Sequence, residues 1–167
     1  MPRARPARGA RTDPTRMRPH ATFLAVLLAA MHPGLPAVAG QASPATEAPS
    51  PVRVVYHFDR DLDQVVHGIG NIKNHLAADP TAQIVVVVNG KAVASLKQGT
   101  ETAGGYPLDL MIEELQGRGV RFEVCANTLK ALKLEPAQLV DGLQVVPSGV
   151  AEIARLQFHE GYAYIKP

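Results

Sequence analysis

The chain has 167 residues, enough for one globular domain, and its 46% hydrophobic and 19% charged residues are ordinary for a protein with a packed core. A single cysteine excludes an internal disulfide, and the lack of a CxxC pair and of an HxxxH pair argues against a structural zinc site. Six arginines precede residue 20, and the rest of the chain carries 11 basic and 14 acidic residues, a net charge of −3. This acidic balance argues against a nucleic-acid partner.

Residues 1–39 have the pattern of an export signal. The arginine-rich start is followed by the apolar run 21–31, which is too short to span a bilayer. Ala37 and Ala39 are small residues at the −3 and −1 positions that signal peptidase recognises, and Ala42 offers a second cleavage point. An uncleaved membrane anchor or a basic arm is the alternative interpretation. We expect a periplasmic or secreted protein that leaves the membrane after cleavage.

Strand and helix patterns alternate in the predicted folded domain, residues 52–167, which follows a flexible linker rich in Pro, Ala and Ser at 40–51. One run reads IVVVV, as expected of a parallel strand that is buried on both faces. Apolar residues at helical spacing, ended by Asp79-Pro80, indicate the first helix. The expected strands are 52–57, 84–88, 120–125, 143–146 and 162–165, and the expected helices are 62–78, 91–98, 108–116, 128–133 and 149–157.

This alternation predicts an α/β fold with a mainly parallel five-stranded sheet covered by helices on both faces. The last strand, 162–165, is expected at an edge of the sheet, where a loop or a partner subunit would have to cover it. In such sheets, ligands and chemistry gather beyond the carboxyl ends of the strands. That rule selects four places: 57–59, 89–90, 125–127 and 147–149.

The only cysteine, Cys125, stands at one of these strand ends, directly before a predicted helix. The free amides and the dipole of a helix N-terminus favour an anion there and so lower the pKa of a thiol. The thiolate is the form that attacks electrophilic sulfur. The residue types are equally consistent with packing, because free cysteine is among the most buried residues and often ends a core strand.

Four further residues are candidates for the same site. His57 ends the first strand and could face Cys125 as a base that helps to form the thiolate. Its alternative role is a hydrogen bond to loop backbone. Asn89, Gly90 and Asn127 offer amide donors and a tight turn for holding a small anion, and their alternative role is to cap the helices that follow.

Five stretches of the predicted domain carry a family pattern: VVYHFD, GNIKNHLAADP, IVVVVNG, LQGRGVRFEVCANTLKAL and VVPSGVAEIARLQFHEGYAYIKP. In them the chain resembles the DsrE/DsrF-like sulfur-relay family, of the exported single-domain kind. The resemblance implies a three-layer α/β/α, flavodoxin-like fold and a homo-oligomer, a trimer or hexamer. It also implies a cysteine that carries sulfur as a persulfide. Within VCANTL, Cys125 stands where exported relatives have their cysteine.

Two functions of different class follow. In the first, the protein is an exported sulfur-relay component in which Cys125 takes sulfur from a donor protein or molecule and passes it to an acceptor. In the second, it is a non-catalytic homo-oligomeric module that binds a small anionic ligand or a protein partner, with Cys125 as packing. Neither hypothesis requires a cofactor.

Overall fold

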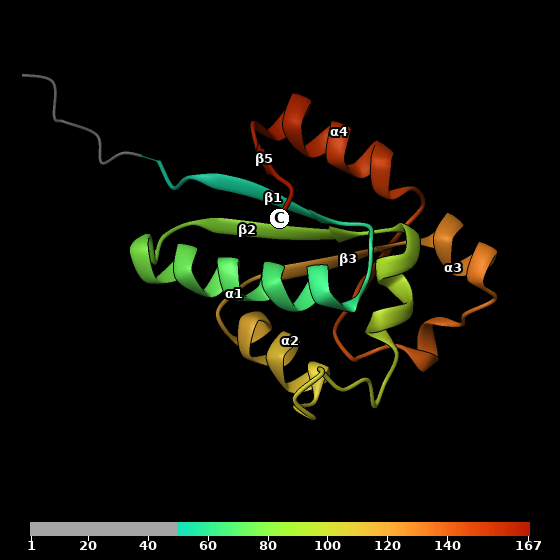
Figure 1. The fold of residues 1–167 in the computed structure, drawn as a ribbon. Coiled ribbons are helices and arrows are strands. Elements are labelled where there is room, and N and C mark those ends of the chain that lie inside the picture. The colour runs from blue at the N-terminus through green and yellow to red at the C-terminus, as the bar shows by residue number, and fades with distance from the viewer. Residues whose placement is uncertain (1–49) are drawn as a thin grey trace, which may run out of the picture. The chain divides into compact units, whose positions relative to one another are not determined.

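A computed structural model of the chain describes residues 50–167 (Figure 1). The predicted signal peptide, 1–39, and linker residues 40–49 lie outside the described residues. The strands are β1 (Arg53–Phe58), β2 (Gln83–Val88), β3 (Arg121–Cys125), β4 (Gln144–Val146) and β5 (Ala163–Ile165). The α-helices are α1 (Leu62–Ala78), α2 (Leu108–Gly117), α3 (Ala126–Leu132) and α4 (Gly149–Glu160), and the 3₁₀ helices are η1 (Gly90–Leu96) and η2 (Pro136–Gln138).

The five strands form one sheet in the order β4-β3-β2-β1-β5, and every neighbouring pair is parallel. The predicted α/β fold is therefore confirmed, and β5 lies at an edge as expected. The central strands β1 and β2 pair over their whole length, from Arg53 opposite Gln83 to Phe58 opposite Val88. Because all five strands run the same way, their carboxyl ends meet at a single edge of the sheet.

The two faces of the sheet are covered unequally (Figure 1). One face packs against α1 and α2 around a large buried cluster that includes Phe58, Ile69 and Phe122. The other face packs against α4 alone, through a smaller cluster that includes Val87 and Leu156. Helices on both faces give the predicted three layers, but the α4 layer is thin.

Residues 91–98 were expected to be an α-helix, whereas the structure has the 3₁₀ helix η1, which starts at Gly90. The backbone of Gly90 is left-handed, with φ +56°, and a Cβ there would lie 2.6 Å from the carbonyl oxygen of Asp59. Only glycine fits this close turn. The helix after Cys125 starts at Ala126, two residues before the predicted 128–133. No loop therefore separates the cysteine from its helix.

Two kinds of feature are absent from the part of the chain that the structure describes. No helix within residues 50–167 is long and apolar enough to cross a membrane. Across the same residues, no three His, Cys, Asp or Glu side chains are grouped so that they could hold a metal ion.

Candidate functional site

Two elements bring backbone amides to Cys125 at the carboxyl edge of the sheet. β3 ends at Cys125, and the peptide that follows turns directly into α3. α4 starts at Gly149, against the same point. A Cβ placed on Gly149 would lie 3.3 Å from the Cβ atoms of both Cys125 and Asn89 and 3.3 Å from Cγ1 of Val87. The approach of α4 to the cysteine thus depends on a residue without a side chain.

The Cys125 thiol is 5% exposed, and burial by itself raises its pKa. Hydrogen bonds to the sulfur have the opposite effect and outweigh burial. Their donors are the N–H of Gly149, the side chain and N–H of Thr128, and the N–H of Asn127. The pKa of the Cys125 thiol therefore lies below its ordinary value, and the thiolate is the form that these donors stabilise.

Two of the predicted ligand-holding residues lie around this sulfur. Asn127 contributes its backbone amide rather than its side chain. Gly90 acts one step further away, because its N–H donates to Oγ1 of Thr128 at 3.3 Å. The Thr128 hydroxyl thus accepts from η1 and is also one of the groups that lower the pKa of the Cys125 thiol. The structure places Gly90, Asn127 and Cys125 in one connected group.

His57 lies on the same face of the sheet, where its hydrogen bonds go to other residues. Its Nε2 is 3.0 Å from Oδ1 of Asn89, and its Nδ1 is 2.8 Å from the hydroxyl of Tyr164. An amide oxygen only accepts, so Nε2 is the donor in the contact with Asn89, while Nδ1 and the Tyr164 hydroxyl share the other hydrogen bond. The contacts of His57 are therefore with Asn89 and Tyr164, and it is not among the groups that lower the pKa of the Cys125 thiol.

Comparison with known proteins identifies the family to which this domain belongs. The model of the DsrE/DsrF-like family matches residues 61–167. The chain belongs to the DsrE/DsrF-like family. The match starts after β1, but β1 lies in the same sheet as the matched strands and completes the domain.

Two solved structures show the same architecture as this DsrE/DsrF-like domain. One is MTH1491, a protein of unknown function from Methanobacterium thermoautotrophicum. It is 38% identical, with a TM-score of 0.62 over 70% of this chain and 99% of MTH1491. The other is the ychN protein from E. coli, which is 14% identical, with a TM-score of 0.59 over 70% of this chain and 99% of its own. The second likeness shows the fold alone. No curated protein matches the chain.

A pocket of about 310 Å³ lies between the sheet and α4 in this DsrE/DsrF-like domain. His57 and Tyr164 line it from the sheet, and Val150, Ile153 and Gln157 line it from α4. Its walls are largely apolar, with one amide and one imidazole. Since Val150 follows Gly149 directly, the pocket lies next to the turn of α4 that contacts Cys125.

Sequence reasoning missed two residues of the site, Thr128 and Tyr164, and found Gly149 only by its place at a strand end. The rule for strand ends did select 147–149, but it could not show that the amide of Gly149 points at the sulfur. Thr128 comes three residues after the cysteine, so its hydroxyl reaches back across the first turn of α3. Tyr164 approaches His57 only because β5 pairs with β1, which spacing in the sequence does not reveal.

Proposed function

We propose that this protein is an exported sulfur carrier in which Cys125 holds sulfur as a persulfide. The observation that carries the proposal is the set of donors around the thiol. Backbone amides from two helices and one hydroxyl converge on a sulfur that burial alone would keep protonated. Donors in this arrangement stabilise negative charge on sulfur, which both an attacking thiolate and a persulfide carry.

The loading step is a displacement at sulfur. The Cys125 thiolate attacks a terminal sulfur atom of an inorganic polysulfide and forms one S–S bond. The bond between that sulfur and the rest of the polysulfide breaks, and a polysulfide shorter by one atom leaves with the electron pair. The product is a persulfide anion on Cys125. Transfer to an acceptor thiolate or another nucleophile reverses the same chemistry, so no oxidant or reductant is consumed.

One observation favours the second candidate, a non-catalytic binding module. Cys125 is 5% exposed, as expected of packing, and the pocket between His57, Tyr164 and α4 could hold a small ligand through the amide of Gln157. In that case the sulfur would serve only as a hydrogen-bond acceptor for the free N–H groups at the starts of α3 and α4. The two candidates differ in whether the native thiol reacts.

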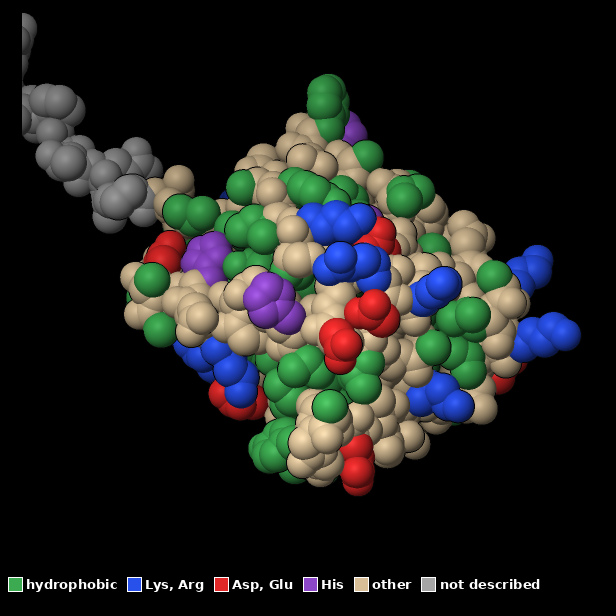
Figure 2. Space-filling view, in the orientation of Figure 1, with side chains coloured by type: hydrophobic (Ala, Val, Ile, Leu, Met, Phe, Trp, Pro, Cys, Tyr) green, Lys and Arg blue, Asp and Glu red, His purple; other side chains and the backbone are tan. Residues whose placement is uncertain are grey.

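We also propose that the working form is a homo-oligomer, a trimer or hexamer, outside the cytoplasm. Support comes from exposed hydrophobic side chains of α4, because Phe158 is 85% exposed and Val150 is 64% exposed. Figure 2 shows hydrophobic side chains at the surface in the region of α4. The neighbouring edge strand β5 exposes Tyr164. Apolar groups gathered in this way mark association surfaces. Light scattering on the mature protein tests this, and a monomer at micromolar concentration would contradict it.

Incubation with polysulfide, followed by removal of excess reagent and intact-mass measurement, tests the carrier function. The wild type should gain one sulfur atom, which dithiothreitol removes. Cys125→Ser should gain none. A wild type that gains no sulfur, and that iodoacetamide labels only after unfolding, would establish the packing role and favour the binding module.

A further inference from the structure

Asn89 and Cys125 lie side by side at the carboxyl edge of the sheet. Their strands, β2 and β3, are parallel neighbours whose last pair is Val88 opposite Val124, so Asn89 and Cys125 are the next residue of each chain. A Cβ placed on Gly149 would lie 3.3 Å from the Cβ atoms of both. The two residues therefore flank one point, the start of α4.

The side-chain amide of Asn89 is held in one orientation by two hydrogen bonds in series. Nε2 of His57 donates to Oδ1 of Asn89 at 3.0 Å, and Nδ1 of His57 is 2.8 Å from the hydroxyl of Tyr164. This contact engages the oxygen end of the amide and leaves the two N–H donors of Nδ2 for other partners. His57 belongs to β1, and β2 lies between β1 and β3 in the sheet. With its oxygen turned toward β1, the amide has its N–H end on the side of β3, where Cys125 lies.

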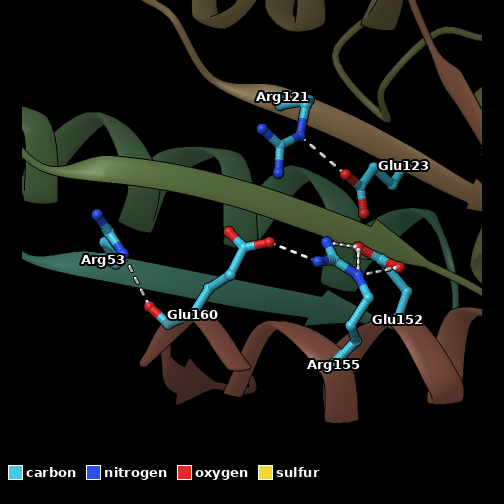
Figure 3. Close-up of polar contacts among 6 residues, drawn as sticks. All are labelled: Arg53, Arg121, Glu123, Glu152, Arg155 and Glu160. Atoms are coloured by element: carbon cyan, nitrogen blue, oxygen red, sulfur yellow. Dashed lines mark hydrogen bonds and ion pairs between the residues drawn. The ribbon is translucent and has the colours of Figure 1, made fainter. Parts of the chain in front are cut away.

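The arginines of the α4 face in Figure 3 are paired with carboxyl groups. Nε of Arg121 donates to Oε1 of Glu123 at 2.8 Å, and Arg155 pairs with Glu152 and Glu160 at 2.5 Å each. Glu123 is 3% exposed, and burial raises its pKa although Arg121 acts in the opposite direction. Because these arginines are engaged, a neutral N–H donor is better placed than they are to meet an anion at Cys125.

Loading with sulfur moves the negative charge by one atom. In the thiolate the charge lies on Sγ of Cys125, and the donors described above, from α3 and α4, act on that atom. In a persulfide anion the charge lies on the outer sulfur, about 2.0 Å further along the S–S bond. The outer sulfur therefore needs a donor of its own, and hydrogen bonds to charged groups are the strong ones.

We propose that Asn89 binds the outer sulfur of the persulfide through Nδ2, and that His57 and Tyr164 are positioning residues that keep this donor turned toward Cys125. The inference rests on the carrier function proposed above and names the species that the site selects, an anionic sulfur chain. A neutral electrophile gains nothing from the same donor. Asn89 is thus a specificity residue, whereas Gly149 and Thr128 act on the thiol itself.

Two rates measured on the native protein test the proposal in Asn89→Leu, which keeps the shape of the side chain without its donors. Sulfur loading from inorganic polysulfide should slow by about tenfold to hundredfold, the value of one hydrogen bond to a charged group. The ratio of Cys125 alkylation by iodoacetate to alkylation by iodoacetamide should fall by about tenfold, because only iodoacetate brings an anion. The matched control is Asn74→Leu, an exposed asparagine of α1 on the opposite face of the sheet, which should change neither.

Substitutions of His57 test the positioning role. His57→Gln keeps an N–H that can donate to Asn89 and should retain most of the loading rate. His57→Leu has no such donor and should lose about as much as Asn89→Leu. An equal loss in both His57 variants would overturn the positioning role. If Asn89→Leu does not fold, Asn89→Asp serves instead, because it still accepts from His57 but has an oxygen in place of the donor.

The two reagents separate this inference from the carrier function. Loading rate and alkylation ratio both at the wild-type value in Asn89→Leu would overturn the inference and leave the carrier function intact. An equal loss of reaction with iodoacetate and iodoacetamide would show that Asn89 only supports the structure, which also overturns it. A wild type that loads no sulfur would count against the carrier function, and the alkylation ratio would still decide whether the Asn89 donor faces an anion at Cys125.

Discussion

Substitution of Gly149 by alanine tests the contact between α4 and the cysteine most directly. The added methyl group would lie 3.3 Å from three carbon atoms, on Cys125, Asn89 and Val87, whereas carbon atoms in ordinary contact are about 3.5–4.0 Å apart. Cys125 and Val87 belong to buried strands and Asn89 directly follows one, so α4 has to move instead. Overpacking of this kind costs about 1–3 kcal/mol. The better helix propensity of alanine returns less than about 1 kcal/mol.

We therefore expect Gly149→Ala to lose about 1–2 kcal/mol of unfolding free energy, or roughly 4–8 °C in Tm. Gly70→Ala is the control, because Gly70 is also helical and a Cβ there meets nothing within 4 Å. It should gain up to about 1 kcal/mol. Since the shift of α4 also withdraws the amide of Gly149, labelling of native Cys125 at neutral pH should slow by about tenfold, the value of one hydrogen bond to a charged group. Wild-type stability together with wild-type labelling would refute this account of the site.

Three other changes have defined outcomes. Gly68→Ala would drive a Cβ into the buried ring of Phe58, so it should lose about 3 kcal/mol or more in urea unfolding, and a neutral result would contradict the packing of α1 on β1. Thr128→Val removes the hydroxyl donor to the sulfur and should raise the pKa of the Cys125 thiol in an iodoacetamide titration, and an unchanged pKa would remove Thr128 from the site. Because the folded pKa of Glu123 is raised, the stability that its proton gives is present below about pH 4 and is lost as pH rises through the folded pKa. Tm should therefore decline over that range in the wild type but not in Glu123→Gln, and parallel curves would count against a raised pKa.

The sheet could be predicted because its strands are marked locally. The run at 84–88 is apolar throughout, which is the pattern of a strand that is covered on both faces. Asp79-Pro80 clearly marks the end of the first helix. η1 could not be predicted in the same way. Its residues have ordinary helical character, but the left-handed turn at Gly90 is imposed by the Asp59 carbonyl, which the fold brings close.

The location of the candidate site could be predicted from the sequence, but the contacts between its residues could not. Cys125, Asn89 and Gly149 could all be assigned to one edge of the sheet because parallel strands end together. Which groups touch depends on side-chain contacts across strands that are not adjacent in sequence. His57 illustrates this, since its partners Asn89 and Tyr164 lie 32 and 107 residues away in the chain. Glu123 gave no signal, because an acidic residue in a strand usually indicates a solvent-facing position.

The central claim is that the sulfur on Cys125 can be passed on, and cyanolysis measures this most directly. Cyanide attacks the outer sulfur of a persulfide, takes it as thiocyanate and returns the cysteine thiolate. After polysulfide treatment and desalting, the native wild type should release one equivalent of thiocyanate per chain, and Cys125→Ser should release none. Equal release from both proteins, or release from neither, would contradict the role of Cys125 as a sulfur carrier.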